Sequence, residues 1–210
     1  MSIFEALILG VVQGITEFLP ISSSGHLIFI PELFGWAPHG LDFDVLLHVA
    51  TLCSILWVLR EDVLLILKGL IHKENKKGVL GWKILLGTVP LVFIGLAISS
   101  QLFDAMRSVE IVAIMLIVWG VFLWAADIYA AKQKKRLETV EGVSWHQALM
   151  IGIFQVFALI PGTSRSGATM TGGLFFGLDR KVAARFSFLL AIPAIAGAGL
   201  LTLLDAAQNG

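Results

Sequence analysis

The chain has 210 residues, of which 57% are hydrophobic and only 14% are charged, and its mean hydropathy is +0.88. About a quarter of the residues of a typical soluble protein are charged, so this composition excludes an ordinary soluble domain. It predicts an all-α, polytopic membrane protein. The formal net charge is zero, no basic patch of the kind that binds nucleic acid is present, and the single cysteine, Cys53, excludes an internal disulfide and a cysteine metal cluster.

The N-terminal part of the chain predicts a hairpin and not a simple span. An apolar run at 2–19 contains Gln13 and Glu17, a polar Ser-Ser-Ser-Gly stretch after Pro20 ends it, and a second apolar run follows at 27–34. Irregular backbone at membrane depth is tolerated only where it is buried in protein or lines a cavity. We therefore expect a re-entrant helix hairpin whose tip carries the polar residues.

The middle of the chain predicts three membrane spans and one surface helix. The spans are expected at 43–59, at 82–103 with a kink at Pro90, and at 109–131. Residues 63–71 have the pattern of an amphipathic, interfacial helix.

A second hairpin is expected after a solvated linker at 133–144. Apolar runs at 146–160 and 168–178 flank a polar loop at 161–167, and a last span is expected at 182–204. This order repeats the hairpin-and-span order of the N-terminal part.

The two polar loops have the same internal spacing. Gln13 precedes Gly25 by the same number of residues as Gln155 precedes Gly167, and Ser-Ser-Ser-Gly in the first loop corresponds to Ser-Arg-Ser-Gly in the second. We interpret the chain as two inverted repeats, whose functional sites lie near the membrane midplane where the broken helices meet.

Residues 1–210 are thus expected to form one membrane domain, with repeat one at about 1–132 and repeat two at about 145–210. Repeat one has a hairpin and three spans, whereas repeat two has a hairpin and one span. The symmetry therefore predicts two further helices after residue 210.

The basic residues predict the orientation of this domain. With both hairpins re-entrant, nearly all Lys and Arg residues lie on one side, which the positive-inside rule makes the cytoplasmic side. Arg107 lies on the opposite side and Arg165 lies in the second loop, so the first loop enters from outside and the second from the cytoplasm. The residues on the cytoplasmic side are Arg60, Lys68, Lys73, Lys76, Lys77, Lys83, Lys132, Lys134, Lys135, Arg136, Arg180, Lys181 and Arg185.

Glu17 is the first candidate functional residue. It follows Gln13 by one helical turn, so both side chains point to one face. A carboxylate at membrane depth is costly without a partner, and Arg165 is the candidate cation. We predict that the two meet in a shared functional site; the alternative is a structural ion pair that pins the hairpins together.

The hydroxyl-rich loops predict a phosphate site. Backbone N–H groups at a helix N-terminus together with hydroxyls bind anions, and arginine suits bidentate phosphate binding. The alternative is simple N-capping by serine. The candidate substrate-binding residues are Ser22, Ser24, Ser164, Ser166 and Thr169.

Two histidines have open roles. His26 directly follows the first loop and could act as a base, a phosphate donor or a covalent acceptor, although a lone histidine is more often a structural residue. His48 lies in the middle of the first expected span, and its role is evenly balanced between packing and support of the site.

The motifs Gln13-Gly-x-Thr-Glu17-Phe-Leu-Pro-x-Ser-Ser-Ser-Gly-His26 and Pro161-Gly-x-Ser-Arg-Ser-Gly-Ala-Thr169 resemble those of the bacterial undecaprenyl-diphosphate phosphatase family of the bacitracin-resistance type. The resemblance runs along nearly the whole chain. Members of that family have two re-entrant hairpins and extend further at the C-terminus. Their first motif often begins with Glu where this chain has Gln13; an amide can ligate a metal but is no general base, so that role would fall to Glu17.

The resemblance implies hydrolysis of undecaprenyl diphosphate to undecaprenyl phosphate and inorganic phosphate, which recycles the lipid carrier for cell-wall synthesis and gives bacitracin resistance. It implies a divalent cation, Mg²⁺ or Ca²⁺, which we place at Gln13 and Glu17 because both offer oxygen ligands. The partners are then the polyprenyl diphosphate lipid and the bilayer of the bacterial plasma (inner) membrane, with a site reached from the outer face. A homodimer remains open.

Our mechanistic hypothesis makes Glu17, Ser23, His26 and Arg165 the catalytic residues. Arg165, the flanking serines and the loop amides would hold the terminal phosphate, Ser23 or a water would attack in line, and His26 would transfer the proton. A secondary transporter or lipid flippase is the alternative, because broken helices that meet at the midplane also build transporters. A non-catalytic scaffold would leave the buried charges unexplained.

Overall fold

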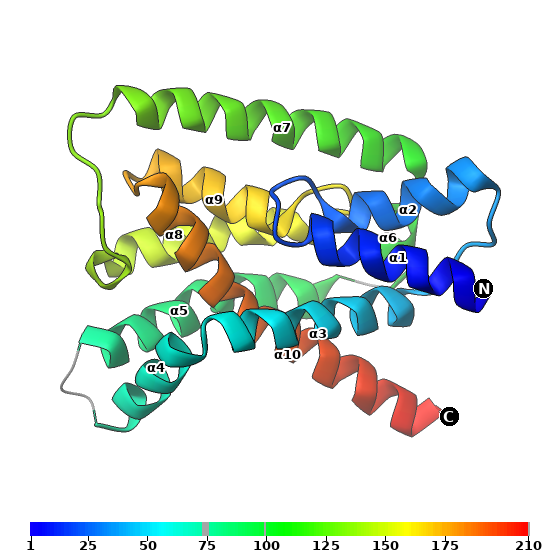
Figure 1. The fold of residues 1–210 in the computed structure, drawn as a ribbon, viewed down its shortest axis with the longest axis horizontal. Helices are drawn as coiled ribbons and strands as arrows, with labels where there is room; N and C mark the ends of the chain where they lie inside the picture. The colour runs from blue at the N-terminus through cyan, green and yellow to red at the C-terminus, as the bar shows by residue number, and fades with distance from the viewer. Residues whose placement is uncertain (73–75, 99, 210) are drawn as a thin grey trace.

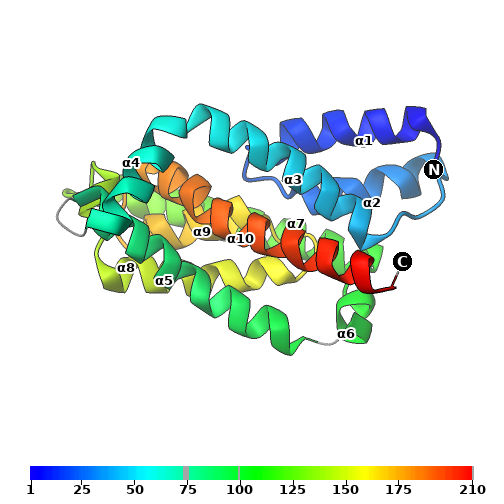
Figure 2. The ribbon, with the colours of Figure 1, turned by 90° about the horizontal axis from the view of Figure 1, so that it is seen from below.

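The computed structural model describes residues 1–72, 76–98 and 100–209, which fold into a bundle of α-helices (Figure 1; Figure 2). The prediction of an all-α protein is confirmed, and Lys73, one of the basic residues used for the orientation, lies outside the described residues. The helices are α1 (Ile3–Thr16), α2 (Ser23–Phe34), α3 (Leu41–Val58), α4 (Arg60–His72), α5 (Lys76–Ala97), α6 (Ser100–Ala105), α7 (Val109–Lys132), α8 (Trp145–Val156), α9 (Arg165–Phe175) and α10 (Arg180–Asn209).

Helices α3, α5, α7 and α10 are long and apolar enough to cross a membrane. Between 17% and 33% of the most apolar stretch of each helix is buried inside the protein, so most of this apolar surface faces outward, as lipid-facing surface does. The expected spans are confirmed, and α4 covers the expected interfacial helix. One boundary is wrong: the span expected to reach residue 103 ends at Ala97, and the separate helix α6 begins where polar Ser100 and Gln101 interrupt the apolar run.

Two pairs of short helices, α1–α2 and α8–α9, lie between α7 and the group of α3, α5 and α10 in the view of Figure 1, whereas α1 lies at the edge of the bundle in Figure 2. The first pair opens toward the end of the molecule that holds both termini, and the second opens toward the opposite end, so their tips point toward each other. Their first helices begin alike, because Ser2 with Glu5 and Ser144 with Gln147 each form a reciprocal capping box. This arrangement fits two re-entrant hairpins that enter from opposite sides.

The largest apolar core joins α8 and α9 to α5 and α10. Helices α5 and α8 approach closely where a Cβ added to Gly152 would lie 2.2 Å from the carbonyl oxygen of Gly87, so only glycine fits there. This contact fixes the second hairpin against the long helices. Large core side chains are Leu80, Ile84, Ile151, Phe186 and Leu190.

A network of ion pairs fastens the end of the bundle at which α4 and α5 meet. Lys77 Nζ lies 2.9 Å from Asp62 Oδ1 and 2.5 Å from Glu141 Oε1, and Arg185 also pairs with Asp62. Burial raises the pKa of Asp62, but hydrogen bonds from Lys77 and Arg185 outweigh it and hold the pKa below its ordinary value. The hydrogen bond from Lys77 likewise lowers the pKa of Glu141.

Candidate active site

The first polar loop is a tight turn between α1 and α2. Helix α1 ends at Thr16, before Pro20, whose ring disfavours helical backbone at the preceding residue. Ser22 then has a φ of 65°, which is rare for a residue other than glycine, and its Oγ accepts a hydrogen bond from the Gly25 N–H at 3.3 Å. The strained Ser22 starts helix α2 and so fixes the direction of Ser23, its first residue.

Glu17 and Arg165 meet across the two loops, as the sequence predicts. Arg165 Nη2 donates to Glu17 Oε1 at 2.5 Å, although the residues are 148 positions apart in the chain. The Glu17 and Arg165 side chains are only 5% and 14% exposed. Arg165 Nη1 also donates to the Ser187 carbonyl on α10 at 3.2 Å, so helix α10 holds the guanidinium in place.

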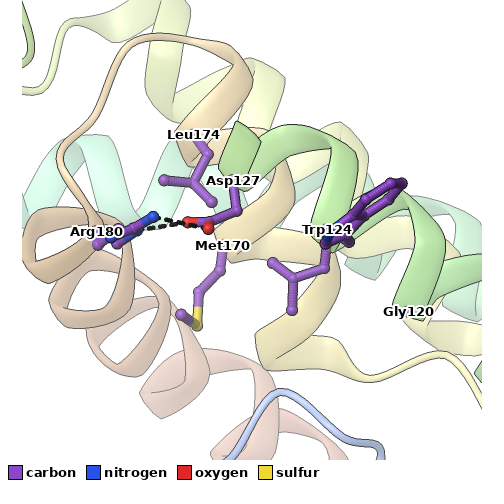
Figure 3. Close-up of a pocket in the computed structure, with 7 residues that line it drawn as sticks. Gly120, Trp124, Asp127, Met170, Leu174 and Arg180 are labelled. Atoms are coloured by element: carbon purple, nitrogen blue, oxygen red, sulfur yellow. Dashed lines mark hydrogen bonds and ion pairs between the residues drawn. The ribbon is translucent and has the colours of Figure 1, made fainter. Parts of the chain in front are cut away.

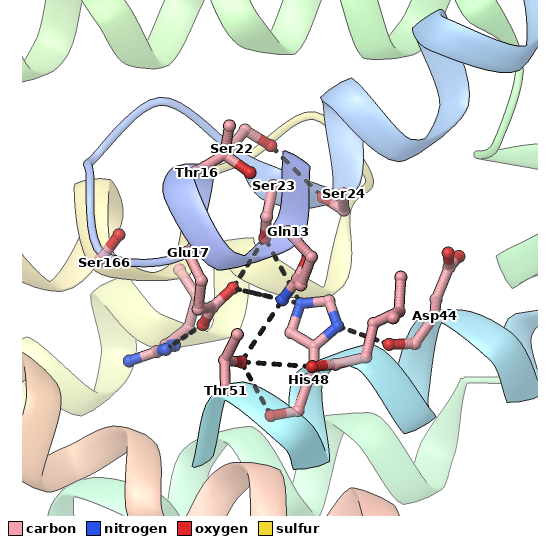
Figure 4. Close-up of polar contacts among 12 residues, drawn as sticks. Gln13, Thr16, Glu17, Ser22, Ser23, Ser24, Asp44, His48, Thr51 and Ser166 are labelled. Atoms are coloured by element: carbon pink, nitrogen blue, oxygen red, sulfur yellow. Dashed lines mark hydrogen bonds and ion pairs between the residues drawn. The ribbon is translucent and has the colours of Figure 1, made fainter. Parts of the chain in front are cut away.

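The second oxygen of Glu17 collects three polar partners (Figure 4). Glu17 Oε2 accepts hydrogen bonds from Ser23 Oγ at 2.7 Å and from Gln13 Nε2 at 3.1 Å, and His48 Nε2 lies 3.3 Å away. Gln13 Nε2 also reaches Thr51 Oγ1 at 3.5 Å. The carboxylate is therefore the hub of a buried polar cluster built from α1, α2, α3 and α9.

The second polar loop forms the N-terminus of α9. Ser164 Oγ accepts from the Gly167 N–H at 3.0 Å and lies 3.1 Å from Ser166 Oγ, and Ser166 Oγ donates to the Leu19 carbonyl in the first loop at 3.3 Å. The N-capping alternative is thus realised at Ser164, and the same hydroxyl pair also joins the two loops. Two hydroxyls and the N-terminus of a helix lie beside Arg165, which is a combination of groups that binds anions.

The remaining candidates lie around this cluster. Ser22 Oγ and Ser24 Oγ are 3.3 Å apart at the start of α2, and Thr169 Oγ1 lies 2.7 Å from Ser187 Oγ. His26 has a hydrogen bond between its Nδ1 and the Ser22 carbonyl at 2.8 Å, which runs along its own helix and not to Glu17. Thr169 and His26 thus support the loops from α9 and α2.

Sequence reasoning undervalued His48 and missed Thr51 and Ser187. His48 and Thr51 lie on α3, a span that is apolar on nearly all sides, so no periodic pattern shows which face points inward. The one available signal was the presence of polar side chains within an apolar span. Ser187 contributes a backbone carbonyl to Arg165, and backbone groups carry no sequence signal.

A second buried polar cluster lies one turn nearer the N-terminus of α3 than His48. The carboxylate of Asp44 lies 2.8 Å from His39 Nε2 and 2.8 Å from Arg107 Nη2. Its backbone carbonyl accepts a hydrogen bond from His48 Nδ1 at 2.7 Å. Asp44 therefore connects the segments that precede α3 and α7 to the candidate active site.

The cavity drawn in Figure 3 is separate from the candidate residues. It has a volume of about 370 Å³ and lies between α7 and α9, where Leu123, Trp124 and Met170 are among its lining residues. The exposed ion pair of Arg180 with Asp127 borders it. None of the sequence-predicted site residues lines this cavity, so it adds nothing to the candidate site.

Gln13 and Glu17, the residues expected to hold a cation, offer oxygen ligands but do not form a complete metal site by themselves. Among the described residues, no group of three or more His, Cys, Asp or Glu is placed to hold a metal ion. Gln13 Oε1, however, is buried without a hydrogen-bond partner in the described part of the chain, and its amide nitrogen is turned toward Glu17. An amide oxygen and a carboxylate one helical turn apart are ligands that Mg²⁺ accepts, since it commonly takes few protein ligands and completes its shell with water and substrate phosphate, but the Gln13 amide would have to turn over to bring Oε1 toward Glu17.

Comparison with known proteins agrees with the motifs. Residues 6–210 match the protein family described as "Bacitracin resistance protein BacA". The chain is 46% identical over 210 residues to the undecaprenyl-diphosphatase of Alteromonas mediterranea, which covers 98% of this chain and 77% of that protein. It is 44% identical over 214 residues to the undecaprenyl-diphosphatase of Marinobacter nauticus, with 100% and 79% covered, and 46% identical over 208 residues to that of Pelotomaculum thermopropionicum, with 98% and 76% covered.

Proposed function

The chain belongs to the bacitracin resistance protein BacA family, and we propose that it hydrolyses undecaprenyl diphosphate at the site where Glu17 meets Arg165. The products are undecaprenyl phosphate, the lipid carrier of cell-wall synthesis, and inorganic phosphate. The 2.5 Å contact between Glu17 and Arg165 carries this proposal, because it brings the two polar loops into one site. Removal of the diphosphate form of the carrier is the activity that gives bacitracin resistance.

The terminal phosphate is held by the N-terminus of α9. Arg165 uses one donor on Glu17 and one on the Ser187 carbonyl, and a guanidinium has five N–H donors, so others remain for a phosphate. The first N–H groups of α9 add donors beside it, and the Ser166 hydroxyl becomes a further donor when it turns from the Leu19 carbonyl to the phosphate. Ser22 and Ser24 contribute hydroxyls from the first loop.

A divalent cation, Mg²⁺ or Ca²⁺, would be held by Glu17 and by Gln13 Oε1. The buried Gln13 Oε1 has no hydrogen-bond partner among the described residues, which supports this assignment, although the Gln13 amide would have to turn over to bring this oxygen toward Glu17. When bound, the cation supplies positive charge that offsets the negative charge of the diphosphate.

The reaction is an in-line displacement at the terminal phosphorus. Ser23 Oγ or a water forms the new bond to phosphorus while the anhydride bond breaks, and its electron pair leaves with undecaprenyl phosphate. His26 Nε2 takes the proton that the attacking oxygen releases and passes it to the departing phosphate group; Nε2 is the nitrogen used because the Ser22 carbonyl engages Nδ1. Arg165 stabilises the charge that builds on the phosphoryl oxygens. If Ser23 is the nucleophile, water then hydrolyses the phosphoserine.

The site is proposed to open to the outer face of the bacterial plasma membrane. The described Lys and Arg residues concentrate at the end where α4 and α5 meet, which the positive-inside rule makes cytoplasmic. The first hairpin then enters from the outer face. The inverted relation of the two repeats and a homodimeric assembly belong to the same proposal.

The test is phosphate release from undecaprenyl diphosphate by the purified protein in detergent. We expect Glu17→Gln and Arg165→Ala each to lower kcat by about a hundredfold or more, because an electrostatic contact of this kind contributes that much. The matched control is Arg180→Ala, since Arg180 forms an exposed ion pair away from the site. Wild-type rates in both site variants, or uptake of the lipid into proteoliposomes without hydrolysis, would refute the proposal.

A further inference from the structure

His48 is held in one orientation by its own helix. Its Nδ1 lies 2.7 Å from the Asp44 carbonyl, and a carbonyl oxygen only accepts, so Nδ1 carries a proton. The Asp44 carboxylate is itself fixed by His39 and Arg107. The ring of His48 therefore points its other nitrogen, Nε2, in a set direction toward the hairpin tip.

That nitrogen forms a triangle with Ser23 and Glu17. His48 Nε2 lies 3.4 Å from Ser23 Oγ and 3.3 Å from Glu17 Oε2, and Ser23 Oγ lies 2.7 Å from the same Glu17 oxygen. A serine hydroxyl has three staggered positions about χ1, so its direction has to be selected by its partners. Ser23 Oγ donates its one proton to Glu17 Oε2, and His48 is the second partner when its Nε2 also carries a proton and donates to Ser23 Oγ.

We propose that His48 is a positioning residue that holds the Ser23 hydroxyl against Glu17 and so sets the direction from which Ser23 Oγ faces the terminal phosphorus. This inference rests on the proposed phosphatase function for its kinetic consequence, but its structural content does not. His48 lies on α3, whereas Ser23 and Glu17 lie on the first hairpin. Helix α3 therefore holds the tip of the hairpin in place through the contacts of His48 with Ser23 and Glu17.

The kinetic test compares His48→Leu with His48→Gln on undecaprenyl diphosphate. Leucine removes the polar atom, and a misplaced reacting group costs up to about a hundredfold in rate, so we expect kcat to fall about 10- to 100-fold with KM within about twofold. Glutamine offers an amide near the position of Nε2, so we expect it to restore kcat to within about threefold of wild type. His146→Leu is the matched control, because His146 is exposed on α8 and packs against Phe176.

The structural test is a crystal structure of His48→Leu together with thermal unfolding in detergent. We expect the Ser23 hydroxyl to leave Glu17 Oε2 while the unfolding temperature stays near that of wild type. A Ser23 hydroxyl that remains on Glu17 would overturn the proposal, whatever the activity. Equal loss of kcat in His48→Gln and His48→Leu would also overturn it, because the imidazole itself would then be required. If wild type releases no phosphate, the proposed function fails, and the structure alone decides the positioning role.

Discussion

Removal of Arg165 alone should destabilise the protein more than removal of Arg165 and Glu17 together. The Glu17 side chain is 5% exposed, so Arg165→Leu leaves a buried carboxylate whose remaining partners are the uncharged Ser23 and Gln13 and the ring of His48. Breaking a buried ion pair by removing one partner costs about 3–5 kcal/mol, whereas replacing both partners with neutral groups is often close to neutral. The coupling energy is the cost of the double variant minus the costs of the two single variants, so we expect its magnitude to be at least about 3–5 kcal/mol.

The coupling energy is measured by a double-mutant cycle. Wild type, Arg165→Leu, Glu17→Gln and the double variant are unfolded in mixed micelles with increasing SDS, and helix content is followed by circular dichroism. Arg180→Leu serves as the control, because its ion pair with Asp127 is exposed and should leave the midpoint nearly unchanged. If the double variant is as unstable as the sum of the two single variants, the reasoning fails, because the two charges would then not depend on each other.

Four further predictions follow from the contacts. Arg165→Ala should lower kcat more than Ser23→Ala if water is the nucleophile, whereas a phosphoserine trapped at position 23 and identified by mass spectrometry would contradict that order and assign the attack to Ser23. EDTA should abolish phosphate release and added Mg²⁺ or Ca²⁺ should restore it; activity that persists in EDTA would remove the cation from the proposal. The pKa of Asp62 is lowered in the folded protein, so its ion pairs stabilise above the ordinary carboxyl pKa of 3.8, and that stability is lost as the pH falls through the lower folded value. Acid unfolding followed by circular dichroism should show this loss in wild type and less of it in Asp62→Asn. Gly152→Ala should lower the free energy of unfolding by about 1–3 kcal/mol because its Cβ overlaps the α5 backbone, while Gly197→Ala, which meets nothing within 4 Å, should not; equal effects would argue against a backbone clash at position 152.

The sequence predicted the membrane spans and the meeting of the two loops for physical reasons that need no structure. Apolar runs of about 20 residues have few other uses, and a carboxylate at membrane depth requires a counter-charge. Arg165 was the available cation within the apolar part of the chain, so its contact with Glu17 followed from charge balance. The Ser-rich loops were also placed correctly at helix N-termini, because serine and glycine favour that position.

The rest of the site depended on tertiary geometry. His48 faces Ser23 because of the rotation of α3 about its own axis. A helix with apolar residues on nearly all sides has no periodic pattern from which this rotation can be predicted. Arg107 was placed on the outer side from the charge count, but its pairing with Asp44, 63 positions away in the chain, could not be read from local patterns. The end of α5 at Ala97 also differed from the expected span, which bridged a polar stretch that includes Ser100 and Gln101 because the apolar residues Leu102 and Phe103 follow it.

The long sequence separation within the Glu17–Arg165 pair has a consequence for biogenesis. A ribosome adds about 5–20 residues per second, so the 148 positions that separate the pair correspond to roughly 7–30 seconds of synthesis. During that interval the newly inserted N-terminal hairpin holds an acidic side chain whose cationic partner has not been made. The contact between Glu17 and Arg165, and with it the candidate active site, can therefore form only after α9 has been made.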